Sequence, residues 1–182
     1  TQHFSCKRKR YDASVLGVVG LKCLQIYGRA SVCCMSAAQI CQLPIQTSLH
    51  LSLQKYCAQL DGFDIHEEAL AQLRPFAQGA LFSRLEDITA HYDLVLVPEV
   101  MEHVPNVQEF LAQLNKINTH KYVITVPDAY SCFARHFAYV ADTDAFVEVV
   151  HQDHNCSYTS YTLSNVIRKY TSRQLEGMWF YN

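Results

Sequence analysis

The sequence lacks the features that mark a membrane-spanning or zinc-ribbon protein. Its 182 residues contain no run of about 18 apolar residues, which is the length that a membrane span requires. No signal peptide is evident. The eight cysteines include no C-x-x-C pair, so the spacing of a zinc ribbon is absent. The formal net charge is only −2 at pH 7, which excludes a strong global attraction to nucleic acid.

What is present is the composition of a folded globular domain. Hydrophobic residues make up 49% of the chain and charged residues 18%, unlike a disordered protein. The length fits one domain over residues 1–182, with a flexible, polar entry at residues 1–12. The basic run at residues 7–10 is either a solvated terminal segment or a contact for phosphate or lipid head groups. Most cysteines stand in apolar runs, so we expect reduced, buried thiols and a cytoplasmic protein.

Short apolar segments alternate with segments of helical periodicity. Strands are expected at residues 31–35, 60–65, 80–83, 92–97, 122–126 and 174–181, and helices at residues 48–58, 66–74 and 161–170. A further helix is expected after Asn106, which can cap it, with Glu109 as its capping-box partner. The alternation predicts an α/β fold, with a Rossmann-like, doubly wound and mostly parallel sheet that carries helices on both faces.

The most informative segment is residues 92–104 (YDLVLVPEVMEHV). It begins as an apolar, β-branched run that is typical of a strand covered on both faces. Pro98 ends this run, and Glu99, Glu102 and His103 follow closely. If the chain is helical there, these three side chains share one face. They would then lie just beyond the carboxyl end of a parallel strand, where open α/β sheets bind their ligands.

Three sequence blocks carry a resemblance to a known family. They are residues 62–70 (GFDIHEEAL), 92–104 and 122–128 (YVITVPD), and a weaker block follows at residues 151–154 (HQDH) and 158–163. The first three blocks resemble, in this order, the second, fourth and fifth strand regions of class I S-adenosylmethionine-dependent methyltransferases of the small Rossmann-like type. The weaker block resembles a segment that precedes a substrate-side helix in related enzymes. The resemblance implies the same fold, with S-adenosylmethionine as the cofactor.

The resemblance also implies which residues hold that cofactor. Asp64 would hold the ribose, because an acid at the carboxyl end of the second strand can accept hydrogen bonds from both ribose hydroxyls. The other interpretation of Asp64 is an N-cap for the helix that follows it. Further cofactor contacts are expected at Ile65, Val97, Glu86 and Asp87. The last two acids would lie near the adenine, or else they form a solvated turn.

The chain departs from the family at the glycine-rich loop after the first strand. In the family, this loop lets the backbone approach the methionine part of the cofactor. Ser36, Ala37 and Ala38 stand where glycines are expected if residues 31–35 form the first strand. A second alignment uses the glycines within residues 15–20, but these lie too far before the second strand. We expect Ser36 and Ala37 to contact the cofactor. A side chain in place of a glycine leaves less room for the cofactor to approach the backbone.

The family also suggests a role for the acids and histidines. In some methyltransferases that modify hydroxyl groups, a similar Glu-x-x-Glu-His segment and a later histidine bind a divalent cation. Glu99, Glu102, His103 and His154 match these positions, and their oxygen and imidazole ligands suit Mg²⁺ or Mn²⁺. The expected catalytic residues are Glu102, His103 and His154, either through such a cation or with an imidazole as general base. The structural alternative is that the acids anchor a loop.

The resemblance therefore implies methyl transfer from S-adenosylmethionine to a hydroxyl or other small nucleophile on a small-molecule or saccharide acceptor. RNA is less favoured as an acceptor, because RNA binding usually needs a basic face. The rival interpretation is a methyltransferase-like module without catalysis, which binds a partner or acts structurally and which the missing glycines favour. The aromatic-rich residues 130–146 form either a lid over the acceptor or, by the more common pattern, the packed core of an inserted helix.

Overall fold

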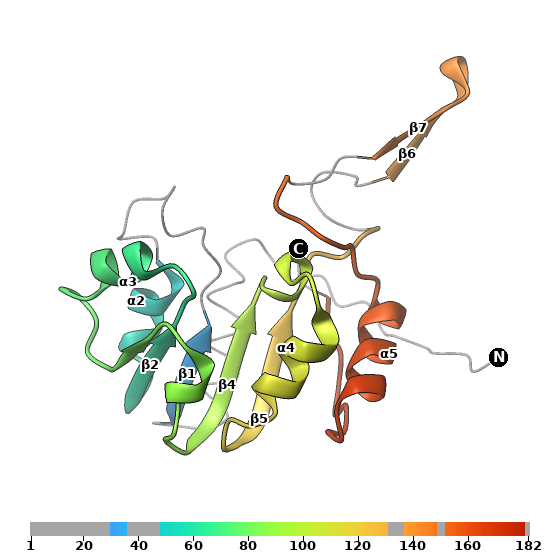
Figure 1. Ribbon diagram of the computed structural model, residues 1–182. Helices are drawn as coiled ribbons and strands as arrows, with labels where there is room; N and C mark the ends of the chain where they lie inside the picture. Colours follow the sequence, from blue (N-terminus) through green and yellow to red (C-terminus); the bar gives the residue numbers. More distant parts are fainter. Residues whose placement is uncertain (1–29, 36–47, 131–136, 149–151, 181–182) are drawn as a thin grey trace. The chain divides into compact units, whose positions relative to one another are not determined.

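Five short strands build one parallel sheet with the order β3-β2-β1-β4-β5 (Figure 1). The strands are β1 (Ser31–Met35), β2 (Gln59–Phe63), β3 (Leu81–Phe82), β4 (Tyr92–Pro98) and β5 (Thr119–Thr125). The order reverses direction between β1 and β4, as it does in Rossmann-like folds. The α/β class and the parallel, Rossmann-like sheet predicted from the sequence are therefore confirmed.

The computed structural model describes residues 30–35, 48–130, 137–148 and 152–180. These residues belong to two compact units. The sheet unit contains the described residues up to 100 and residues 113–125, and the second unit contains residues 101–112 and those from 126 onward. The expectation of a single domain stays a prediction. None of the helices in the described part of the chain is long and apolar enough to cross a membrane.

The core of the sheet unit is built around β1. This strand pairs with β2 on one side and β4 on the other, and its last four residues are buried. Alternate residues of the three strands point to one face, where they meet α2 (Leu49–Gln54). The buried cluster on this face consists of Ala30, Val32, Cys34, Leu53, Leu60, Leu94 and Leu96. Each large apolar side chain buried there contributes roughly 1.5–3 kcal/mol to stability.

The remaining helices begin and end largely where the sequence predicts. They are α3 (Glu67–Leu73), α4 (Val107–Leu114) and α5 (Ser160–Tyr170), with short 3-10 turns η3 (Leu85–Asp87), η4 (Met101–His103) and η5 (Ala141–Thr143). The predicted cap of α4 is confirmed, since the Glu109 amide donates to Asn106 Oδ1 at 3.2 Å. α2 is shorter than predicted because the chain already turns toward β2, with the Ala58 amide donating to the Ala30 carbonyl at 3.0 Å.

Two structural expectations are wrong. The aromatic-rich segment forms no inserted helix in its described part, but an antiparallel hairpin of β6 (Phe137–Val140) and β7 (Ala145–Glu148). Tyr139 and Phe146 face each other across it with ring centroids 5.5 Å apart, and both are exposed. Asp144 closes the turn with a positive φ of 48°. The predicted last strand is also absent from residues 174–180, where the Trp179 ring packs so closely on Gly177 that a Cβ there would lie 2.8 Å from it.

A buried carboxylate, Asp61, joins three parts of the sheet unit. Its Oδ2 accepts from the Tyr92 hydroxyl at 2.7 Å and from Gln59 Nε2 at 3.0 Å, and its Oδ1 accepts from the Ala80 amide at 2.9 Å. Both oxygens are thus satisfied, as a buried acid requires. Gly79 allows this approach, because a Cβ at that position would lie 1.9 Å from the Leu60 carbonyl oxygen.

A second buried ionisable group, His50 of α2, should make stability depend on pH. Burial lowers the pKa of His50 to about 4, although nearby Asp61 raises it. The unfolded chain takes up this proton near pH 6.5 and the folded chain only near pH 4, so stability falls as the pH falls between these values. We expect a loss of about 3 kcal/mol over this interval. Urea unfolding should show that His50→Leu removes this part of the pH dependence, whereas the exposed-site variant His91→Leu keeps it. Equal pH profiles for wild type and His50→Leu would contradict the assignment.

Candidate functional site

The carboxyl end of β2 places Asp64 in a fully buried position. Its Oδ1 accepts from the His66 amide at 2.9 Å and lies 3.0 Å from His66 Nδ1. Its Oδ2 is buried and has no hydrogen-bond partner among the residues that the structure describes. A buried carboxylate oxygen is costly unless a donor reaches it. One oxygen of Asp64 is thus fixed locally, and the other is suited to a donor from a ligand.

The N-cap interpretation of Asp64 is wrong. α3 begins at Glu67 with His66 as its N-cap residue, and Asp64 instead closes a turn onto the amide two residues later. Ile65, the next residue, exposes 71% of its surface. A large apolar side chain beside a buried acid, at the carboxyl end of a strand, is an arrangement that can hold a ribose and pack against a base.

The other predicted cofactor residues lie in different surroundings. Glu86 and Asp87 are on the exposed turn η3, where Glu86 accepts from Arg84 Nε at 2.9 Å. This hydrogen bond lowers the pKa of the Glu86 carboxyl. The Val97 side chain is fully buried within β4. Ser36 and Ala37 directly follow β1 but lie outside the described residues.

Glu99 leaves the carboxyl end of β4 in a left-handed conformation, with a φ of 49°. Its amide donates to the Thr125 carbonyl at 3.0 Å, and the Thr125 hydroxyl donates to Glu99 Oε1 at 2.8 Å. A positive φ costs a non-glycine residue about 1 kcal/mol or more, which these bonds to the end of β5 offset. The expected helical face of Glu99, Glu102 and His103 is therefore wrong, because the chain is not helical at Glu99 and the turn η4 begins only at Met101.

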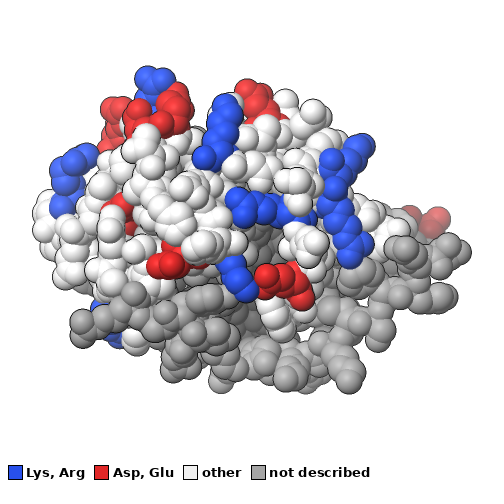
Figure 2. Space-filling model, turned by 90° about the horizontal axis from the view of Figure 1, so that it is seen from below, with Lys and Arg blue, Asp and Glu red and all other residues white. Residues whose placement is uncertain are grey.

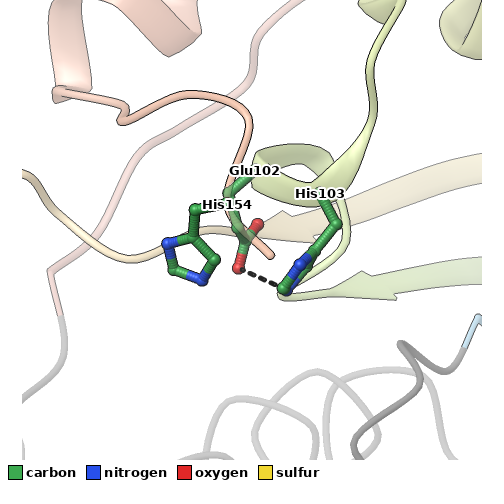
Figure 3. Close-up of side chains that lie close together, drawn as sticks. All are labelled: Glu102, His103 and His154. Atoms are coloured by element: carbon green, nitrogen blue, oxygen red, sulfur yellow. Dashed lines mark ion pairs between the residues drawn. The ribbon is translucent and has the colours of Figure 1, made fainter. Parts of the chain in front are cut away.

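The second unit brings together Glu102, His103 and His154 (Figure 3). One ligand atom from each lies within 4.8 Å of the others, and within the described part of the chain this is the group that could hold a metal ion. Glu102 Oε1 lies 3.9 Å from His103 Nε2. The two imidazole rings meet edge to face with their centroids 4.8 Å apart. Three of the four residues predicted for a cation therefore converge, and Glu99 is not a member of the group.

Backbone contacts hold the two segments of this cluster together. The amides of Asn155 and Cys156 both donate to the Glu102 carbonyl, at 2.7 and 3.3 Å. Asn155 Nδ2 donates to the His103 carbonyl at 2.5 Å. These bonds place His154 beside Glu102, which exposes only 1% of its surface. A small adjoining pocket is lined by Glu102, Pro127, Ala129, His154, Cys156 and Ser157.

The contact of His103 Nδ1 with the Asp153 carbonyl, at 3.0 Å, decides which ring nitrogen carries the proton. A carbonyl oxygen only accepts, so Nδ1 must donate to it. In the neutral ring, the lone pair then lies on Nε2, on the side of Glu102. This is the arrangement of a histidine that ligates a metal or accepts a proton.

Sequence reasoning missed two supporting residues, His66 and Asn155. The helical pattern of residues 66–74 indicates only a helix for His66, although its place two residues after the acid is the spacing of a side-chain turn. Asn155 follows His154 directly, but its contact with His103 joins residues 52 positions apart. No local signal could have found that contact.

No family model and no curated protein matches the sequence. Solved structures that resemble the chain include several methyltransferases. An S-adenosylmethionine-dependent methyltransferase from Mesorhizobium loti has a TM-score of 0.48 at 11% identity, over 81% of this chain and 78% of that one. The N-methyltransferase NodS from Bradyrhizobium japonicum WM9 has a TM-score of 0.43 at 16% identity, over 56% of this chain and 57% of its own, so this chain spans little more than half of NodS. An O-methyltransferase of Brevibacillus brevis, in complex with S-adenosyl-L-homocysteine, has a TM-score of 0.35 at 12% identity, over 81% of this chain and 60% of that one.

The two buried acids of β2 and its carboxyl end should respond differently to replacement by asparagine. Asp61→Asn replaces one of the two acceptor oxygens of Asp61 with an amide NH₂ group, which then faces a donor instead of accepting from it, so we expect a loss of about 2 kcal/mol. Asp64→Asn keeps an oxygen that can accept from the His66 amide. The NH₂ group replaces the oxygen that has no partner among the described residues, so the free energy of unfolding should change by no more than about 0.5 kcal/mol. Chemical denaturation of both variants without ligand measures the difference. Equal losses would show that Asp64 is a structural acid like Asp61.

Proposed function

We propose that the chain binds S-adenosylmethionine at the carboxyl ends of β1 and β2 and transfers its methyl group to a hydroxyl or other small nucleophile. One observation carries this proposal: Asp64 Oδ2 is a buried acceptor, directly after the second strand of a Rossmann-like sheet, that lacks a donor among the described residues. The two ribose hydroxyls of the cofactor are donors of the required kind. The resemblance of the three sequence blocks adds support.

On the cofactor side, the chain's own residues would bind and orient. Asp64 would accept hydrogen bonds from the ribose, and the exposed Ile65 would pack against the adenine. Val97 would contact the cofactor from the end of β4, although its side chain lies in the core. Ser36 and Ala37 would contact the methionine part of the cofactor. Glu86 and Asp87 are the weaker members of this proposal because both are solvated. Bound cofactor supplies an electrophilic methyl group, and methyl transfer needs mainly positioning and charge handling.

On the acceptor side, His103 is the proposed general base. With the cofactor bound as the source of the methyl group, His103 Nε2 would take the proton that the acceptor hydroxyl gives up. The Asp153 carbonyl holds the ring in the tautomer that permits this, and the Glu102 carboxylate would stabilise the resulting imidazolium. His154 would be the third residue on the acceptor side, in the same cluster as Glu102.

A divalent cation is the alternative use of the same cluster. Glu102, His103 and His154 would hold it, and the ion would lower the pKa of an acceptor hydroxyl. One carboxylate with two imidazoles suits Mn²⁺ or another d-block ion better than Mg²⁺, which prefers oxygen ligands. Of the two ions expected from the resemblance, we therefore favour Mn²⁺.

The proposed acceptor is a small molecule or a saccharide. RNA is less favoured, in keeping with the net charge of −2. On the face that Figure 2 shows, acidic side chains stand among the basic ones over the described surface. The proposed setting is the cytoplasm, which four free thiols in the described part of the chain support, at Cys33, Cys34, Cys57 and Cys156.

A module without catalysis is the second candidate, because Ser36, Ala37 and Ala38 stand where the family has glycines. Calorimetry with S-adenosyl-L-homocysteine separates the two candidates. We expect binding with a dissociation constant in the micromolar range, weakened about tenfold or more in Asp64→Asn, because the amide nitrogen cannot accept from the ribose. Folded wild-type protein that fails to bind at millimolar ligand would exclude the enzyme.

The cation proposal has a separate test. Millimolar Mn²⁺ should raise the unfolding temperature by about 2–4 °C, because the ion would bind only the folded state. Mg²⁺ should raise it less, because it prefers oxygen ligands to imidazole. His154→Ala should abolish the rise. His91→Ala removes an exposed imidazole outside the cluster, which packs on His120 with ring centroids 4.7 Å apart, and should leave the rise intact. No shift with Mn²⁺, or an equal shift in His154→Ala, would contradict the cation proposal. The general base would then be the one remaining role proposed for the cluster.

A further inference from the structure

His66 directs two donors at one oxygen of Asp64. Its backbone amide lies 2.9 Å from Oδ1 and its ring Nδ1 lies 3.0 Å from the same atom. The Asp64 side chain is fully buried, whereas the His66 side chain is about half exposed, at 49%. The imidazole thus folds back from the surface onto the acid, although solvent is available to it.

Two donors on Oδ1 determine the orientation of the carboxylate. With one donor, a carboxylate can rotate about its last bond and exchange its oxygens. With the amide and the ring on the same oxygen, rotation would break both bonds, so Oδ2 keeps one direction. That is the oxygen without a hydrogen-bond partner among the described residues.

The His66 ring can donate to Asp64 whether the ring is neutral or protonated. An ionised carboxylate only accepts, so the proton of a neutral His66 ring must lie on Nδ1, and an imidazolium also carries a proton there. His66 belongs to the turn that leads into α3, where it is the N-cap residue. The start of the helix therefore sets the backbone position from which the ring reaches Asp64.

We propose that His66 is a positioning residue for the cofactor: it fixes the Asp64 carboxylate so that Oδ2 is presented to the ribose hydroxyls before the ligand arrives. This inference rests on the proposed function and deepens it. Pre-ordering the acceptor removes an ordering cost that binding would otherwise meet. His66 acts only through Asp64 in this account and makes no contact with the ligand.

A double-mutant cycle tests this account, with S-adenosyl-L-homocysteine as the probe in calorimetry. His66→Phe keeps a ring but removes the donor, and we expect affinity to fall roughly threefold to tenfold. His66→Asn places an amide nitrogen where Nδ1 lies and should restore affinity to within about twofold of wild type. In the Asp64→Asn background, His66→Phe should change affinity by less than about twofold, because the oxygen to be positioned is gone.

The outcomes separate the inference from the proposed function. If wild type fails to bind the probe, both fall. If wild type binds and His66→Phe binds equally well, only the positioning role is wrong. A loss in His66→Phe that persists undiminished in the Asp64→Asn background would also overturn it, since His66 would then act independently of Asp64. His91→Phe, an exposed histidine of the sheet unit, serves as the matched control and should bind like wild type.

Discussion

The parallel pairing of β1 with β2 and β4 is the interaction on which the sheet unit depends. β1 has only five residues, and four of them are buried between its two neighbours. Because all strands run in the same direction, their carboxyl ends meet at one edge. Asp64 after β2 and Glu99 after β4 lie at that edge as a direct consequence. The acids there reflect the topology of the sheet rather than attraction between side chains.

Asp61 and Asp64 are two buried acids of one strand region that differ in their hydrogen bonds. Asp61 receives donors on both oxygens from three different residues and ties the sheet together. Asp64 receives its described donors on one oxygen, and both come from His66. Two equally buried acids, three residues apart, therefore have different partners. The difference supports a ligand for Asp64 where Asp61 needs none.

Much of the sheet could be predicted because its apolar, β-branched runs end at clear signals such as Pro98. The helix after β4 could be predicted because Asn106 is a typical N-cap residue. The arrangement beyond β4 could not, since the left-handed Glu99 depends on a hydroxyl from Thr125, 26 residues away. His103 and His154 meet through contacts about 50 residues apart, which the family resemblance suggested and periodicity did not. The hairpin of β6 and β7 was missed because aromatic richness alone does not distinguish a helix from a strand.

The central claim is that a buried, pre-oriented oxygen of Asp64 receives the ribose of S-adenosylmethionine. A crystal structure of the protein with S-adenosyl-L-homocysteine tests it most directly. The account predicts both ribose hydroxyls within hydrogen-bond distance of the Asp64 carboxylate, at least one of them on Oδ2, while His66 remains on Oδ1. A ligand bound elsewhere, or a ribose without contact to Asp64, would contradict it.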